Sequence, residues 1–575
     1  MIIPYTNYLF KEKIDMTFKP TQEQTEAVKL CETGVNARIS AFSGASKTTT
    51  LSLIAEALHK KGKNGLYVAY NKAIASEAKG KFPASVDCRT IHSLAFANLS
   101  AQMKAKLKPT AMFAKDFAKR YGFRGLYVEL EGDKRGDKYV GESGIWLMVK
   151  ETIANFCRSD DDNIHNKHFG KLDWMHVKPF LTGQVEEIVV KVARKYWKDL
   201  IDPKNDLTIT HDVYLKLYGM SDHVPDVDYI MLDEAQDANA IMVQILKRFP
   251  KQVIVVGDRY QNIYSFNKTV NILDTHEGQQ LYLTKSFRFG NNVQEVANYI
   301  LNYRGSERNL EGNGKDNGVT HYANSRASMR PDVVICRTNA GCLEAILEYS
   351  ELYPDLRIGT TVDAKQIGIY CSSYIALKED RMKDVKHNLL MAFKSFSDYK
   401  DYMANDPDDA EIRKMDQLIQ TFGDKRILAS LIKCTKDGEI LITTAHKSKG
   451  LEWDNVVIYA DYYYSFEMGE LTVTDEELNV IYVAVTRAKV NVDVSGIADL
   501  IMFLRSEYKQ NSGLVKENNL TPKRNSNGIE VGVKALQIDG GDPFAREKIK
   551  EFMQHVGSAE KAMQDYESEQ DYWLN

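Results

Sequence analysis

Residues 41–50 read AFSGASKTTT, and the interpretation of the whole chain depends on this stretch. It follows the apolar run ARISAF (37–42) and leads into a helical pattern, TTTLSLIAEALHKK (48–61). Small residues between a strand and a helix let backbone N–H groups point at phosphate oxygens, and Lys47 and Thr48 supply an ammonium and a hydroxyl. Ala41 and Ser46 replace both glycines of the GxxxxGK[ST] pattern. The loop alone therefore fits a phosphate site and a capped strand-to-helix turn equally well.

The composition narrows the class of protein. The chain has 575 residues, enough for roughly three to five domains, and its 43% hydrophobic and 27% charged residues are ordinary for a globular protein. A formal net charge of −4 means that nucleic acid would have to bind in a local groove. The seven cysteines form no CxxC pair, which argues against a zinc ribbon and fits a reducing cytosol. We expect neither a signal peptide nor a membrane helix, because no apolar run is long enough.

Strand and helix patterns alternate through most of the chain, which predicts an α/β fold with parallel sheets. Apolar runs such as YIMLDEA (229–235), QVIVVGD (252–258) and EILITTA (439–445) have the length of buried strands. Two largely helical stretches, 97–222 and 376–435, interrupt this rhythm and are interpreted as insertions. The predicted domains are one α/β domain from 17–96 and 223–283, a second from 284–375 and 436–504, the two insertions, and a linker and tail over 505–575.

A second motif, which contains two acidic residues, supports the hypothesis of a phosphate-binding site. YIMLDEAQD (229–237) places Asp233 and Glu234 at the end of an apolar strand. Asp233 there can hold a metal ion, while Glu234 can orient and deprotonate water. The alternative is a pair of acids at a helix N-terminus, favoured by the helix dipole. Arg288 in LTKSFRFG and Arg487 in YVAVTRAK could place positive charge on a γ-phosphate, although a lone arginine is more often a surface residue.

Taken together, the ordered motifs resemble superfamily 1A DNA helicases of the UvrD-like type, over roughly residues 17–500. Within that superfamily the chain looks closest to the F-box DNA helicase branch, without an F-box. FKPTQEQTEAV (18–28) resembles the adenine-reading Q motif, and VVGDRYQNIYSF (255–266) resembles motif III. The resemblance implies two RecA-like motor domains, each with a mainly helical insertion.

The same resemblance implies roles for individual residues. ATP would be contacted by Gln24, Gly44, Ala45, Ser46, Lys47, Thr48, Thr49, Phe287, Arg288, Glu452 and Arg487. Mg²⁺ would be held by Thr48 and Asp233, and catalysis would rest on Lys47, Glu234, Gln261, Arg288 and Arg487. DNA would be contacted by Tyr70, Asn71, Lys72, Thr90, His92, Tyr264, Phe266, Thr444, His446 and Lys449.

The implied activity is an ATP-dependent single-stranded DNA translocase and 3′→5′ helicase acting in repair, recombination or replication. Its substrates would be single strands and single-strand/duplex junctions. We expect a monomer in the cytoplasm of a bacterial cell or a phage-infected host, and the tail is a candidate site for a protein partner. The alternative is an ATP-gated DNA-binding regulator with weak or no unwinding. A GTPase or kinase is disfavoured because NKAI (71–74) lacks the aspartate of a guanine-reading NKxD motif.

Ser46 is the single departure from the helicase pattern. Helicases of this type commonly carry Ala at the place of Ala41, and Gly44 is retained. A Cβ at position 46 can clash where the backbone must approach phosphate closely. The remaining nucleotide positions are intact, so we expect a working site with weakened ATP affinity or rate.

Overall fold

The structure is a computed structural model. It describes residues 19–69, 71–107, 112–128, 138–171, 182–264, 269–314, 318–322, 329–387, 390–393, 395–397, 399–400 and 410–511. Two predicted DNA-contacting residues, Tyr70 and Phe266, lie outside this part of the chain. So does the predicted tail from residue 512 onward.

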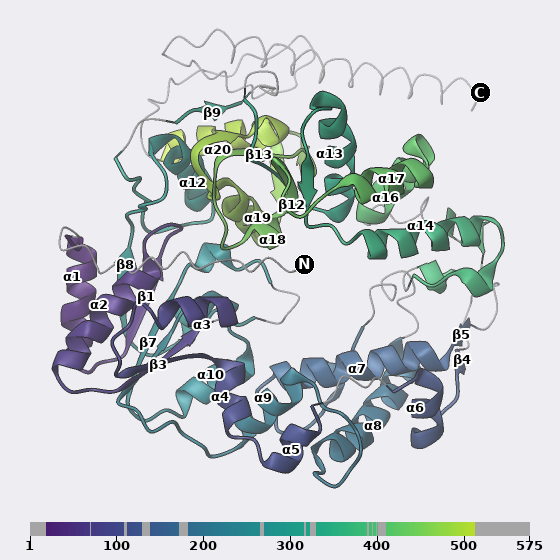
Figure 1. The fold of residues 1–575 in the computed structure, drawn as a ribbon, viewed down its shortest axis with the longest axis horizontal. Helices are drawn as coiled ribbons and strands as arrows, with labels where there is room; N and C mark the ends of the chain where they lie inside the picture. Colours follow the sequence, from purple (N-terminus) through teal and green to yellow (C-terminus); the bar gives the residue numbers. More distant parts are fainter. Residues whose placement is uncertain are drawn as a thin grey trace, which may run out of the picture. The chain divides into compact units, whose positions relative to one another are not determined.

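A six-stranded parallel sheet forms the centre of the first α/β domain, with strand order β3-β2-β6-β7-β1-β8 (Figure 1). Val- and Ile-rich central strands such as β7 are buried along their whole length, because helices cover both faces of a parallel sheet. The strands are β1 (Ala37–Ala41), β2 (Gly65–Ala69), β3 (Val86–Thr90), β6 (Tyr229–Leu232), β7 (Gln252–Gly257) and β8 (Gln279–Leu283). Their helices are α1 (Gln22–Cys31), α2 (Lys47–Lys60), α3 (Lys72–Ala78), α4 (Ile91–Ala97), α10 (Ala240–Lys247) and α11 (Ile272–Thr275).

The second α/β domain repeats this design with strand order β11-β12-β10-β13-β16-β9, again parallel. Its strands are β9 (Thr320–His321), β10 (Val333–Cys336), β11 (Ile358–Thr360), β12 (Ile440–Thr444), β13 (Trp453–Ile458) and β16 (Ala488–Asp493). Its helices are α12 (Asn291–Tyr303), α13 (Asn339–Leu352), α18 (Ala445–Ser448), α19 (Asp475–Val485) and α20 (Ala498–Asn511). An antiparallel hairpin, β14 (Tyr464–Glu467) and β15 (Glu470–Val473), precedes α19. The predicted fold class is confirmed, whereas the exact domain boundaries stay predictions.

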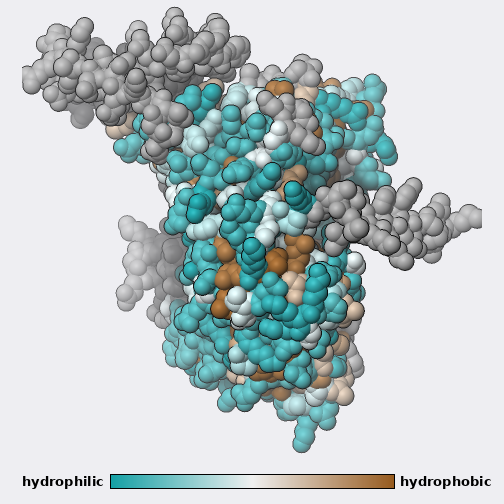
Figure 2. Space-filling view, turned by 90° about the vertical axis from the view of Figure 1, so that its left-hand side faces the viewer, coloured by the Kyte–Doolittle hydropathy of each residue, from teal (hydrophilic) through white to brown (hydrophobic). Residues whose placement is uncertain are grey.

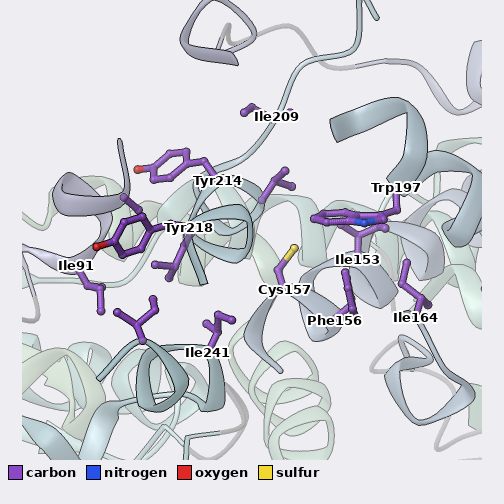
Figure 3. Close-up of a cluster of buried hydrophobic side chains, with 14 of the residues drawn as sticks. Ile91, Ile153, Phe156, Cys157, Ile164, Trp197, Ile209, Tyr214, Tyr218 and Ile241 are labelled. Carbon is purple, nitrogen blue, oxygen red and sulfur yellow. The ribbon is translucent and has the colours of Figure 1, made fainter. Parts of the chain in front are cut away.

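The first predicted insertion is mainly helical and shares a core with the first sheet. Figure 3 shows Phe156 and Trp197 in a buried cluster that also receives Ile91 and Ile241 from helices of the α/β domain. The elements of this stretch are α5 (Ala101–Ala105), α6 (Ala114–Tyr121), β4 (Leu126–Val128), β5 (Lys138–Val140), α7 (Glu142–Arg158), α8 (Thr182–Ile201) and α9 (His211–Met220). Shared packing of this kind ties the insertion to the sheet that carries the phosphate loop.

The second predicted insertion is helical as well. It contains α16 (Ala410–Phe422) and α17 (Asp424–Lys433), and α17 packs on α14 (Ala364–Lys378). Residues of these helices belong to the same hydrophobic cluster as strands β10 and β12. Helix α14 begins before residue 376, so the helical stretch is continuous with the second α/β domain.

The outer surface is largely hydrophilic on the face drawn in Figure 2, with a smaller hydrophobic group near its centre. Within the described part of the chain, no helix has the length and apolar character needed to cross a bilayer.

Candidate nucleotide site and its interface with the second domain

The phosphate loop lies between β1 and α2, and two of its residues have a left-handed backbone. Gly44 has φ +75°, and a Cβ built there would lie 2.3 Å from Ser286 Oγ and 2.8 Å from Arg288 Cβ. Ser46 has φ +54° and ψ +47° directly before the first helical residue. Glycine adopts this conformation freely, whereas a residue with a Cβ is strained in it. The backbone angle of Ser46 therefore explains why glycine is favoured at this position.

The two expected carboxylates lie directly beside the two expected loop residues. Lys47 Nζ is 3.1 Å from Glu234 Oε2, and Thr48 Oγ1 donates to Asp233 Oδ2 at 3.3 Å. Tyr67 on β2 donates to the same Asp233 oxygen at 2.7 Å. The parallel strands β1 and β6 end at one edge of the sheet, so residues 185 or more positions apart meet there. The sequence pattern carried no signal for Tyr67.

Charge and burial set the protonation of this cluster. Burial opposes ionisation of Glu234, but the charges of Lys47 and Lys449 outweigh it and hold the pKa of Glu234 at about 2. Burial and the charge of Glu234 raise the pKa of Asp233. Burial alone would lower the pKa of Lys47, yet the charges of Glu234, Asp233 and Asp258 raise it. The result is an ionised base candidate beside a lysine whose charged form is favoured by its acidic neighbours.

Glu234 is itself held in a strained backbone. It has φ +51° and ψ +44°, and a short 3₁₀ turn, η4 (Ala235–Asp237), follows it. Gln236 donates to Glu234 Oε2 at 2.7 Å and accepts from the Asp258 backbone N–H at 3.0 Å. Strained non-glycine residues often lie at functional sites, where surrounding contacts maintain them. Here the Gln236 side chain links the ends of β6 and β7 and fixes the orientation of the carboxylate.

Both predicted arginines reach the phosphate loop from the other side. Arg288 Nη1 donates to Ser43 Oγ at 3.0 Å, and Arg487 Nη2 donates to the same oxygen at 3.3 Å. Arg288 also pairs with Glu452 at 2.7 Å. Burial and the neighbouring charge of Arg288 lower the pKa of Arg487 to about 9. The structure thus gathers both guanidinium groups, Glu452 and the loop residue Ser43, which sequence analysis did not single out.

A further connection joins the loop to the segment that contains Gln261. Gln261 Nε2 donates to Asp258 Oδ2 at 2.8 Å, and Tyr482 of α19 donates to the same oxygen at 3.1 Å. The Ser43 N–H donates to the Tyr482 hydroxyl at 3.1 Å. Asp258 is buried, and burial raises its pKa. Asp258 was not predicted; its place at the end of β7 was the available signal.

The remaining predicted nucleotide residues fall into two groups. Gln24 is buried, caps the start of α1 with Thr21 and donates to Thr50 Oγ1 at 3.1 Å, so it lies beside the phosphate loop. Ala45 is buried as well. Thr49 and Phe287 are exposed, and Phe287 has 41% of its surface accessible. An exposed ring at this place is available to stack on a planar base.

Three predicted DNA-contacting residues have a local structural role. Asn71, Thr90 and Thr444 are the N-caps of α3, α4 and α18, and each side-chain oxygen accepts a backbone N–H. Lys72 is exposed, and His92 Nε2 is 4.0 Å from Asp212 Oδ1 of α9. Capping leaves the hydroxyl or amide donor of these residues able to bind elsewhere, so their DNA role stays a prediction.

Lys449, His446 and Tyr264 lie together at the contact between the two α/β domains. Lys449 Nζ pairs with Asp237 Oδ2 at 2.6 Å and lies 4.9 Å from the centre of the Tyr264 ring. Burial raises the pKa of Asp237 to about 6 despite that lysine. His446 is half-buried, and burial lowers its pKa. In this structure the lysine and histidine bind the first α/β domain, while their predicted contact with DNA is untested.

The donor set fits a nucleoside triphosphate with Mg²⁺. Thr48 Oγ1 and Asp233 Oδ2 are hard oxygen ligands of the type Mg²⁺ takes, usually together with waters and substrate phosphates. Among the described residues there is no cluster of three or more His, Cys, Asp or Glu side chains that would hold a metal by itself. A magnesium ion would therefore be held by this pair together with the phosphates.

Comparisons with known proteins agree with this geometry. The family model described as "UvrD-like helicase C-terminal domain" matches residues 217–499, and the model described as "AAA domain" matches residues 24–267. The chain belongs to the UvrD-like helicase family. It is 28% identical over 491 residues to F-box DNA helicase protein 1 of Schizosaccharomyces pombe, covering 79% of this chain and 54% of that protein. It is 30% identical over 537 residues to F-box DNA helicase 1 of Gallus gallus, covering 85% and 50%.

The family resemblance inferred from the motifs is therefore confirmed. A putative ATP-dependent DNA helicase of Acanthamoeba polyphaga mimivirus is 25% identical over 278 residues, covering 46% of this chain and 33% of that protein. The chain spans about half the length of the two F-box helicases it matches. Their names describe whole proteins, so the activity of this chain is a separate question.

Proposed function

We propose that this UvrD-like chain is an ATP-dependent single-stranded DNA translocase and a 3′→5′ DNA helicase. The observation that carries the proposal is the convergence of Arg288 and Arg487 on Ser43, opposite the Lys47–Glu234 pair. Arginines from one domain that face the phosphate loop of another stabilise charge during phosphoryl transfer only when the two domains are together. Such a site couples hydrolysis to domain movement.

The residues divide the chemistry among themselves. ATP bound with Mg²⁺ supplies the γ-phosphoryl group that water attacks. Lys47 and the loop N–H groups would bind phosphates, and Thr48 and Asp233 would hold Mg²⁺. Glu234 is ionised and aimed by Gln236, so it can accept a proton from the attacking water. Arg288 and Arg487 would stabilise the charge on the transferred group.

DNA would lie across the two α/β domains, in repair, recombination or replication. The proposal of DNA as the substrate is supported by the family and by the names of the F-box relatives. Exposed side chains such as Lys72 would contact phosphates, so affinity should fall as salt rises. Alternating closure and opening around ATP would move the protein along one strand. The polarity and the monomeric state belong to this proposal.

DNA-dependent hydrolysis is the first test. ATP turnover is measured with and without single-stranded oligonucleotide, and we expect clear stimulation. Unwinding is then followed on duplexes with a 3′ or a 5′ single-stranded tail, of which the 3′-tailed substrate should be opened. Absence of stimulation would refute the translocase, and preference for the 5′ tail would refute the polarity alone.

A second candidate function is an ATP-gated DNA-binding regulator that unwinds weakly. The strained Ser46 backbone favours it, because strain in the phosphate loop can reduce turnover. Under this alternative, nucleotide would still change DNA affinity, while the rate of unwinding would be negligible. The tailed-duplex assay separates the two candidates.

A further inference from the structure

Three consecutive backbone carbonyls of the first α/β domain are each bound by a side chain of the second. Gln261 O accepts from Lys449 Nζ at 2.8 Å, and Asn262 O accepts from Asn479 Nδ2 at 3.0 Å. Ile263 O is 3.1 Å from His446 Nε2. We call Lys449, Asn479 and His446 the carbonyl clamp. The clamped segment begins with Gln261, whose side chain donates to Asp258, and directly precedes Tyr264.

The three side chains of the clamp are the hydrogen-bond donors and the three carbonyl oxygens are the acceptors. A carbonyl oxygen only accepts hydrogen bonds, so His446 must carry a proton on Nε2 to bind Ile263. Burial lowers the pKa of His446, which leaves the neutral ring with that proton. Tyr264 donates in return to the His446 carbonyl at 3.3 Å. The segment is therefore tied to the second domain at three successive residues.

Asn479 is the member of the clamp with the simplest set of contacts. It lies on α19, three residues before Tyr482, so both side chains emerge on the same face of the helix. Tyr482 contacts Asp258 and Ser43 near the phosphate loop, while Asn479 contacts Asn262. One helix, α19, thus contacts both Asp258 beside the phosphate loop and Asn262 close to Tyr264.

The buried position of Asn479 indicates that its amide group has a role besides packing. Only 6% of its surface is accessible, and its Oδ1 has no hydrogen-bond partner among the described residues. An unpaired buried acceptor is destabilising, and a leucine of similar size would avoid that cost. The donor to Asn262 is the benefit that the amide provides here.

We propose that Asn479 is a positioning residue that couples nucleotide occupancy to DNA affinity by holding the 261–263 segment. This inference rests on the proposed function, since it requires that the protein bind both ATP and DNA. Lys449 and His446 also hold this segment. Lys449 pairs with Asp237 and His446 contacts the Tyr264 ring, so a substitution of either residue changes several interactions at once. A substitution of Asn479 removes the hydrogen bond to Asn262 and leaves the contacts with Asp237 and Tyr264 in place.

The test measures coupling directly with the full chain. The Kd of a fluorescent oligo-dT strand is determined with and without a non-hydrolysable ATP analogue and Mg²⁺, and the ratio of the two values is compared between variants. In the wild type we expect a ratio in the usual range of roughly 5- to 150-fold for coupled sites. Because the contacts of Lys449 and His446 remain, Asn479→Leu should lower this ratio by roughly two- to tenfold, the effect of one hydrogen bond. The Kd values for DNA alone and for nucleotide alone should each change less than about twofold.

Two further variants keep the test decisive. Asn479→Ala also lacks the N–H donor and adds no ionisable group, so it should lower the ratio by a similar factor. Asn298→Leu is the matched control: Asn298 is buried and donates to Leu310 O at 2.9 Å inside the second domain, so its loss should lower thermal stability and leave the ratio unchanged.

The outcomes distinguish this inference from the proposed function. A coupling ratio in both Asn479 variants that equals the wild-type ratio overturns the clamp and leaves the helicase proposal standing. A wild type that binds DNA equally with and without nucleotide refutes the proposed function and the clamp together. Equal loss of coupling in Asn298→Leu would show a general effect of destabilisation and would also overturn the clamp.

Discussion

Replacing Ser46 with glycine should relieve strain at the start of α2. Ser46 has φ +54° and ψ +47°, and its side chain makes no capping hydrogen bond to the helix. Its backbone oxygen accepts from the Thr50 N–H at 3.0 Å and from Thr50 Oγ1 at 3.1 Å, and both bonds survive the substitution. The change therefore removes a Cβ and a hydroxyl from a left-handed position and leaves the loop's backbone contacts in place.

The magnitude follows from two opposing contributions. A left-handed residue with a Cβ is less stable by about 1–2 kcal/mol, which the glycine recovers. Glycine also has more freedom in the unfolded chain, which costs about 0.4–1 kcal/mol. The net expectation is a gain of about 0–1.6 kcal/mol in the free energy of unfolding, with a central value of about 0.8 kcal/mol. ATP turnover should be equal or higher, because the relaxed loop has no Cβ near the phosphates.

Thermal unfolding and steady-state ATP hydrolysis check both expectations. Ser46→Ala is the matched control, because it removes the hydroxyl and keeps the Cβ in the left-handed backbone. The alanine variant should retain the strain and unfold near the wild-type temperature. A lower unfolding temperature for Ser46→Gly, or a turnover loss of tenfold or more (about 1.4 kcal/mol), would refute the strain argument and show that the serine side chain contributes directly.

Three further predictions concern charge and hydrogen bonding. Arg288→Ala should spare nucleotide binding and slow hydrolysis by roughly 10³-fold; single-turnover kinetics with unchanged rate would contradict its role. Tyr67→Phe removes a hydrogen bond that lowers the pKa of Asp233, so the acid limb of the pH–rate profile should move to higher pH at fixed Mg²⁺. An unmoved limb would mean that Asp233 does not set it. Burial lowers the pKa of Lys216 to about 8, so its charged form is disfavoured on folding. Between about pH 8 and 10.5 the folded chain has lost this proton while the unfolded chain still holds it, so stability should rise with pH over that range. Lys216→Met should flatten this rise in urea titrations.

Local sequence was sufficient for the fold class, while the roles of the nucleotide residues stay predictions. The strands that precede Asp233 and Gln261 are largely apolar and buried throughout, as is typical of central strands in a parallel sheet. Strand β1, which precedes Lys47, contains Arg38 and Ser40 and is buried at alternate residues. Lys–Thr after one strand and Asp–Glu after another are short motifs whose chemistry depends on neighbours in the chain. The pairings of Lys47 with Glu234 and Thr48 with Asp233 followed once the strand ends shared an edge.

Contacts between distant segments were decided by the tertiary structure alone. No periodicity in the sequence indicates that Tyr67 binds Asp233, that Ser43 receives two arginines, or that Asn479 holds Asn262. These contacts join residues from 166 to 444 positions apart. The Tyr67–Asp233 bond depends on β2 and β6 being neighbours in one sheet, and the others depend on how the two α/β domains meet. The backbone angle of Ser46 belongs to the same class, because a residue with a Cβ enters the left-handed region only when surrounding structure maintains it.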